Sequence, residues 1–210
     1  MKRRIIKKLL REGLLTELAS GKHLIIVDVQ PEYMSSASHI ATDLFEYINQ
    51  HYDAFGDITF LYNGEDTLGM IAEHDYREWL VEMGLDEEIA YNVRMYDKGY
   101  AFFRYCMDSN IDHDATINLV RYMSQHGVHD TRELDKEFWD GFIDEYGDED
   151  VRELLEFSDD AIHMPDLMDF LQKFNNIVLV GGHTEECLKE VEIALEALGK
   201  TYQTWDKYTY

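Results

Sequence analysis

One cysteine near the end of the chain has the neighbours of a reactive thiol. A continuous apolar run at residues 177–180 is typical of a strand that is buried on both faces. Gly181 and Gly182 then allow a tight turn, and Thr184 is a candidate N-cap for the helix that follows. Cys187 would be the third residue of this helix, where unpaired backbone N–H groups and the helix dipole favour a thiolate. Cys187 is therefore a candidate nucleophile.

Cys187 also has a purely structural interpretation. A cysteine outside a disulfide commonly acts as a small buried apolar residue. Glu185 and Glu186 lie beside the sulfur in the sequence, and their charges would partly offset the helix dipole. The choice between these interpretations depends on residues elsewhere in the chain.

Two charged residues lie at or after the ends of other predicted strands. Asp28 interrupts the apolar run of residues 24–30, where a carboxylate either caps the following turn or has a chemical role. Lys98 follows a predicted strand at residues 91–96. Ligands of parallel sheets bind beyond the carboxyl ends of the strands, which share one edge. We therefore expect Asp28, Lys98 and Cys187 to meet at that edge.

The elements that would position these residues alternate between strand and helix. This alternation predicts an α/β fold, with three α/β/α layers around a central, mainly parallel sheet. The expected strands are residues 24–30, 57–62, 91–96 and 177–180, and the expected helices are 38–52, 70–83, 166–173 and 184–198.

Residues 104–164 interrupt the alternation and read as an acidic helical insertion. Expected helices cover residues 115–125, 131–146 and 149–157, and we expect a small core of four apolar residues, Phe138, Trp139, Phe142 and Ile143. The insertion would either cover the pocket as a lid or form an oligomer interface. We therefore expect a single domain over residues 1–210 that carries this insertion.

Composition limits the class of protein. The net charge is −24, although residues 1–12 hold six basic residues and one acidic residue. Such an acidic surface repels nucleic acid and anionic membranes, so we expect neither as a partner. Two cysteines indicate a reducing compartment, and the absence of a long apolar run or a signal-peptide pattern favours a cytoplasmic protein. An amphipathic helix is expected at about residues 2–19. Such a helix can bind an anionic membrane surface, but it more often packs on its own domain or on a partner subunit, and we expect that role here.

Three segments resemble the motifs of the isochorismatase-like cysteine hydrolases, a family that includes nicotinamidases and N-carbamoyl amidohydrolases. They are Ile25-Ile-Val-Asp-Val-Gln-Pro-Glu-Tyr33, Lys98-Gly-Tyr-Ala-Phe-Phe103 and Gly181-Gly-His-Thr-Glu-Glu-Cys-Leu188. They follow the order of the family's motifs, and the third has the family's spacing from glycine to cysteine. The resemblance covers residues 23–103 and 166–210.

The resemblance implies roles for the three charged or nucleophilic residues. Cys187 would attack an electrophilic carbon, Asp28 would take the thiol proton and later activate water, and Lys98 would lower the cysteine pKa. It also implies a cis peptide bond between Gly182 and His183.

Backbone N–H groups at His183 and Cys187 would form an oxyanion hole. Gly182, Thr184, Gln30 and Phe102 would complete the oxyanion hole and the pocket around it.

Departures from the family pattern matter too. The middle motif lacks the family's serine, His183 replaces a small residue, and Glu186 replaces an apolar one. The metal motif of nicotinamidases is absent after the second strand. Residues 112–114 contain metal-ligand types, but acidic helical segments produce such neighbours easily. We therefore predict no metal and no cofactor.

The sequence thus predicts a cysteine-dependent hydrolase that cleaves a C–N bond of a small amide or carbamoyl compound through a thioester. We expect a small-molecule substrate and a homo-oligomer, a dimer or larger. One alternative is a catalytically silent relative that acts as a binding or assembly module. Another is an isochorismatase-type hydrolase of a vinyl ether.

Overall fold

The computed structural model describes residues 21–65, 69–98, 106, 111–128, 133–147, 150–152 and 167–210. The chain divides into two compact units. The sheet unit comprises residues 1–97, 175–182 and 202–210, and the helical unit comprises residues 98–174 and 183–201. The amphipathic helix predicted at residues 2–19 lies outside the described residues.

The sheet unit contains five parallel strands. They are β1 (His23–Val27), β2 (Asp57–Tyr62), β3 (Arg94–Asp97), β4 (Ile177–Gly181) and β5 (Tyr202–Thr204), in the order β3-β2-β1-β4-β5. The predicted α/β fold with a central parallel sheet is therefore confirmed. The strand order reverses direction between β1 and β4, which makes the ends of these two strands the switch point of the sheet.

Side chains from both faces of the sheet are buried. Leu24 pairs in register with Ile58 and Val178, and these side chains belong to one apolar core. On the alternate positions, Ile25 and Leu179 are also fully buried. Apolar burial on both faces explains the continuous apolar runs in the sequence, and it is consistent with the predicted three-layer α/β/α fold.

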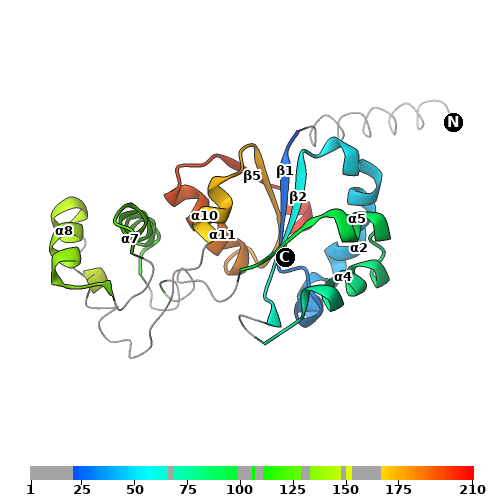
Figure 1. The fold of residues 1–210 in the computed structure, drawn as a ribbon, viewed down its shortest axis with the longest axis horizontal. Helices are drawn as coiled ribbons and strands as arrows, with labels where there is room; N and C mark the ends of the chain where they lie inside the picture. Colours follow the sequence, from blue (N-terminus) through cyan, green and yellow to red (C-terminus); the bar gives the residue numbers. More distant parts are fainter. Residues whose placement is uncertain are drawn as a thin grey trace. The chain divides into compact units, whose positions relative to one another are not determined.

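Three helices cover one side of the sheet within the sheet unit (Figure 1). They are α2 (Met34–His51), α4 (Glu73–Glu82) and α5 (Glu87–Asn92). Short 3-10 turns accompany them at Pro31–Tyr33, Tyr52–Ala54 and Asp206–Tyr208. In α2 the buried residues recur at helical spacing and include Ile40, Leu44 and Ile48, which join the core.

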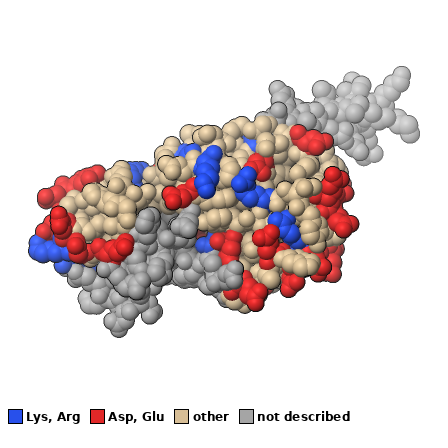
Figure 2. All heavy atoms as spheres, viewed as in Figure 1, with Lys and Arg blue, Asp and Glu red and all other residues tan. Residues whose placement is uncertain are grey.

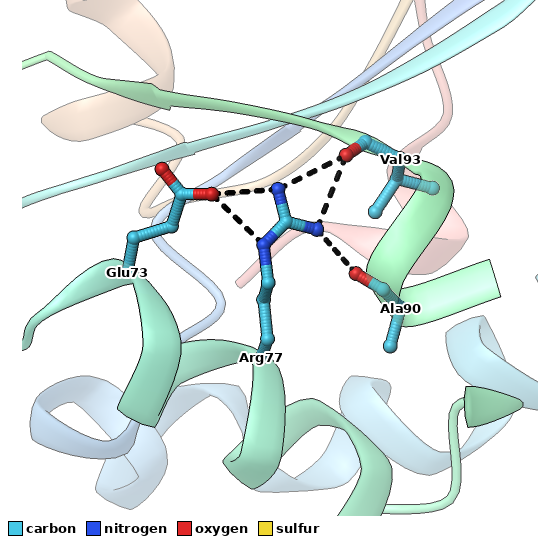
Figure 3. A network of polar contacts seen from close by, with 4 residues as sticks. All are labelled: Glu73, Arg77, Ala90 and Val93. Carbon is cyan, nitrogen blue, oxygen red and sulfur yellow. Dashed lines mark hydrogen bonds and ion pairs between the residues drawn. The ribbon is translucent and has the colours of Figure 1, made fainter. Parts of the chain in front are cut away.

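Arg77 ties α4 to the segment between α5 and β3. Its guanidinium forms an ion pair with Glu73 one turn earlier, with an Nη2–Oε1 distance of 2.7 Å. The same group donates to the backbone carbonyls of Ala90 and Val93 (Figure 3). These two carbonyls lie near or beyond the end of α5, where helical carbonyls lose their intrahelical partners, so Arg77 satisfies them.

The helical unit contains α7 (His113–Gln125), α8 (Lys136–Tyr146), α10 (Leu167–Gln172) and α11 (Cys187–Ala197). Arg121 of α7 donates to the carbonyls of Glu196 and Ala197 at the end of α11. On α8, Phe138 and Phe142 pack against Tyr122 of α7, with ring centroids 5.0 and 5.7 Å apart. The described part of residues 104–164 is helical and contains no strand.

Several predicted boundaries were wrong. The expected strand at 91–96 is instead the end of α5 followed by β3, because Asp86 caps a helix by accepting hydrogen bonds from the N–H groups of Glu88 and Ile89. β1 stops at Val27 rather than at residue 30. In the predicted insertion, α8 begins at Lys136 rather than at residue 131, and much of the segment expected at 149–157 lies outside the described residues.

Asp and Glu are spread over the face drawn in Figure 2, with fewer Lys and Arg between them. This distribution agrees with the strongly negative net charge. Within the described ranges, every helix is too short or too polar to cross a lipid bilayer.

Candidate functional site

The switch point of the sheet is formed by the ends of β1 and β4. Val27 and Gly181 are paired in register at these ends, so the residues that follow them leave the sheet side by side. Asp28 follows Val27, is fully buried and has a φ of 50°. This left-handed conformation is uncommon outside glycine, and Asp is one of the few other residues that adopt it. It ends β1 at Val27 and places a carboxylate at the switch point.

Gly181 shows why β4 needs glycine at this position. Its φ is 75°, and a Cβ atom would collide with the carbonyl oxygen of Val27 and the side chain of Val29. Gly182 also has a positive φ, of 59°. The predicted tight turn after β4 is therefore present, and glycine permits both the conformation and the close approach of β1.

Tyr210 contacts the residues that follow both strands. Its hydroxyl donates to the backbone carbonyl of Asp28 at 3.0 Å, and its N–H donates to the carbonyl of Gly182 at 3.2 Å. Tyr76 of α4 lies close by and donates to the Val29 carbonyl at 2.7 Å. Burial and then the Asp28 carboxylate raise the pKa of Tyr76 well above its usual value, so this residue remains a neutral hydrogen-bond donor.

Asp28 belongs to a polar cluster with three other side chains of the sheet unit. The amide nitrogen of Asn63, just after β2, lies 3.3 Å from Asp28 Oδ1 and 3.1 Å from the Tyr33 hydroxyl. The side-chain oxygen of Gln30 accepts a hydrogen bond from the backbone N–H of Asn63 at 2.8 Å. The structure thus brings together two of the predicted site residues, Asp28 and Gln30, and adds Asn63 and Tyr33.

Cys187 is the first residue of α11, so the prediction that it would be the third was wrong. The N-cap position belongs to Glu186 rather than to Thr184, because residues 184–186 form a turn. The carbonyl of His183 accepts the N–H groups of Glu186 and Leu188 and fixes this turn. Cys187 is partly buried, and its position in the first turn of a helix agrees with the sequence argument.

Lys98 forms a buried ion pair with Glu190 in the helical unit. The Nζ–Oε2 distance is 2.8 Å, and the two side chains are 3% and 5% exposed. Glu190 lies three residues after Cys187 on α11, and residues at this spacing have Cβ atoms about 5–6 Å apart on one helix face. The structure therefore holds the Lys98 ammonium beside a carboxylate that lies one turn from the candidate nucleophile.

The structure places the other predicted residues as follows. Gly182 belongs to the sheet unit, whereas His183 and Thr184 belong to the helical unit and are exposed. The peptide bond between Gly182 and His183 is trans, so the expected cis bond is absent from this described segment. Phe102 lies outside the described residues. Asp28 lies in one unit and Lys98 and Cys187 in the other, so their meeting at one site stays a prediction.

In the part of the chain that the structure describes, side chains of the kinds that bind metal ions lie close together at one place. His74, Asp75 and Glu78 lie together on the exposed face of α4. Of the residues that the sequence singled out, Asp112 caps α7, and the His113 ring nitrogen lies 3.0 Å from a Glu196 carboxylate oxygen. Both therefore have structural roles.

Sequence reasoning missed two polar residues. Glu190 occupies a buried position on the apolar stripe of α11, three residues after Cys187. A charged residue on such a stripe could have been recognised from the sequence as a site candidate. Asn63 was not expected among the site residues. Its position just beyond β2, at the carboxyl edge of the predicted sheet, could have identified it.

In comparisons with protein-family models, curated proteins and solved structures, no match to this chain was found. The resemblance to isochorismatase-like hydrolases therefore rests on the three sequence motifs alone.

Proposed function

We propose that the protein is a cysteine-dependent hydrolase that cleaves a C–N bond of a small amide or carbamoyl compound. The observation that carries the proposal is the pairing of β1 with β4 at the switch point. The carboxylate of Asp28 directly follows one of these strands, and Cys187 follows the other after a five-residue turn. An α/β sheet binds its ligands at this position, and a thiol needs a nearby base there to react.

The chemistry would proceed in two stages. Asp28 takes the proton of the Cys187 thiol, and the thiolate attacks the carbonyl carbon of the substrate. The backbone N–H group of Cys187, in the first turn of α11, stabilises the oxyanion. The C–N bond then breaks as protonated Asp28 returns the proton to the departing amine. Asp28 next removes a proton from water, which attacks the thioester and releases the acid. The proton returns to the Cys187 sulfur.

Lys98 would stabilise the thiolate in this scheme. An ammonium near a thiol lowers the thiol pKa, although the partner carboxylate of Glu190 offsets part of that effect. Because the pair is buried, the ammonium has a fixed position rather than a mobile one.

We also infer that the enzyme is cytoplasmic and works as a homo-oligomer on a small molecule. Light scattering coupled to gel filtration would test the oligomeric state.

The test compares two cysteine variants on a panel of small amides, carbamoyl compounds and vinyl ethers. Cys187→Ala should lower turnover of any substrate at least about a thousandfold, since a covalent nucleophile acts as a unit with its base. Cys106→Ala is the matched control, because Cys106 is fully buried and burial raises the pKa of its thiol. Mass spectrometry of the quenched wild-type reaction should find the acyl group on Cys187.

Unchanged turnover in Cys187→Ala would refute the thiolate mechanism. If only vinyl ethers are consumed, the protein is instead an isochorismatase-type hydrolase of vinyl ethers.

A second candidate function is a catalytically silent binding module. The observation that favours it is the carboxylate of Glu190, which neutralises the ammonium expected to activate the thiol. Alkylation by iodoacetamide distinguishes the two. An activated Cys187 reacts at neutral pH faster than a small-molecule thiol of ordinary pKa, whereas the silent module shows no such excess.

A further inference from the structure

Asn63 is held in place from several directions within the sheet unit. It follows β2 and is 3% exposed. The backbone N–H of Asn63 donates to the side-chain oxygen of Gln30 at 2.8 Å, and the backbone carbonyl of Asn63 accepts from the Gln30 side-chain nitrogen at 3.4 Å. Its amide nitrogen donates to Asp28 and to the Tyr33 hydroxyl. The side chain therefore has one defined orientation.

This orientation identifies which end of the Asn63 amide faces Asp28. A carboxylate only accepts hydrogen bonds, so the nitrogen and not the oxygen of the amide must lie against it. The oxygen, Oδ1, is consequently directed elsewhere. It is buried and makes no hydrogen bond in the structure. Buried carbonyl oxygens are nearly always paired, so this acceptor is an exception that requires an explanation.

We propose that Asn63 Oδ1 accepts a hydrogen bond from an N–H group of the substrate, and that this contact selects primary amides and ureido compounds over esters. The proposal rests on the proposed function and deepens it. Asn63 Oδ1 and the neighbouring Asp28 carboxylate are both acceptors, and a terminal –NH2 group supplies two donors. An ester would instead place its own acceptor oxygen against Oδ1.

The selectivity follows from the buried position of the acceptor. A site that is built to pair with an N–H group leaves a buried polar atom unpaired when the analogue lacks that group. The methyl ester of an acid is one methyl group larger than its primary amide and lacks both N–H donors, so it cannot pair with Oδ1. Asn63 would therefore be a specificity-determining residue rather than a catalytic one.

The experiment measures binding rather than turnover, in the full-length Cys187→Ala protein. The probes are two matched pairs, acetamide with methyl acetate and benzamide with methyl benzoate. Selective ¹⁵N-asparagine labelling gives a side-chain NH2 signal for Asn63, which is assigned by its loss in Asn63→Leu. The exposed Asn92, whose side chain donates to the Glu88 carbonyl, serves as the internal control.

The amides should shift the Asn63 signal, leave the Asn92 signal unchanged and bind at least about tenfold more tightly than their esters. The preference should disappear in Asn63→Leu. Equal binding of amide and ester, an unchanged Asn63 signal with every probe, or a preference that survives in Asn63→Leu would each overturn the proposal. If Asn63→Leu does not fold, Asn63→Ser provides both the assignment and the comparison, because it also removes the amide but keeps a small polar side chain.

This readout separates the inference from the hydrolase proposal. If amides bind through Asn63 but the wild-type protein hydrolyses none of them, only the hydrolase proposal fails. If the wild-type protein hydrolyses amides while the Asn63 signal stays fixed, only the present inference fails.

Discussion

Acidification should destabilise the sheet unit through His23. This residue begins β1 and is 5% exposed, with its Nε2 atom 2.9 Å from the Thr59 hydroxyl. Burial lowers the pKa of His23 from 6.5 to about 4; Asp57 opposes this shift, and Arg94 adds to it. The folded state therefore holds the ring neutral, whereas the unfolded chain binds a proton as the pH falls below 6.5.

The sign and the size of the effect follow from these two pKa values. The full stability is present above pH 6.5 and is lost as the pH falls towards 4, because the unfolded state binds more protons over that range. Between pH 7.5 and pH 5.0 the loss due to His23 amounts to about 2 kcal/mol, and the limit below pH 4 is about 3 kcal/mol.

Urea unfolding at the two pH values measures this loss. In a Trp139→Phe background, the remaining tryptophans, Trp79 and Trp205, both belong to the sheet unit, so fluorescence reports on that unit. Carboxylates contribute their own pH dependence, and the comparison with His23→Gln removes it. The variant should lose about 2 kcal/mol less than the wild-type protein between the two pH values. Equal losses in both proteins would refute the assignment of a neutral buried His23.

Three further predictions concern the stability of single contacts. In urea titrations, Lys98→Met or Glu190→Leu alone should lower the free energy of unfolding by about 3–5 kcal/mol, because each variant leaves an unpaired buried charge. The double variant should recover much of this loss, because it leaves no such charge. Losses that simply add would contradict the pairing. Gly181→Ala should cost about 2–4 kcal/mol in urea unfolding through strain and overlap, whereas Gly199→Ala, which also has a positive φ but open space around it, should cost about 1–2 kcal/mol. Equal costs would show that the close approach to β1 is unimportant. Arg77→Met should lower the melting temperature through a loss of about 1–3 kcal/mol, because two backbone carbonyls lose their donor, and an unchanged melting temperature would contradict that role.

Most of the sheet could be predicted from the sequence because its signals are local. The short strand β5 was not expected, since its three residues, Tyr202–Thr204, form no apolar run. The apolar run at residues 177–180 can be buried on both faces only as a central strand, and β4 has this environment. The strand at 57–62 was predicted with its observed bounds. By contrast, α5 was missed, since its six residues are too few for a helical period and its cap, Asp86, was not recognised.

The candidate site could be predicted only in part. Asp28 and Cys187 are visible because each interrupts or follows an apolar run at a strand end. The positions of Glu190 and Asn63 could have marked them as candidates, but their partners lie 92 and 35 residues away, and no local pattern reveals which residues they pair with. The start of α11 was misplaced because Thr184 is a good capping residue, yet the hydrogen bonds to the His183 carbonyl select a different turn.

The pairing of β1 with β4 also has a consequence for biosynthesis. His23 pairs with Ile177, so the side of β1 that pairs with β4 stays unpaired until 154 further residues have been translated. During that interval β2 can already pair with the other side, while the apolar residues 24–27 of β1 keep an open row of N–H and carbonyl groups. Nascent chains that stall before residue 177 should therefore aggregate or recruit chaperones, and release of β4 from the ribosome should end this exposure.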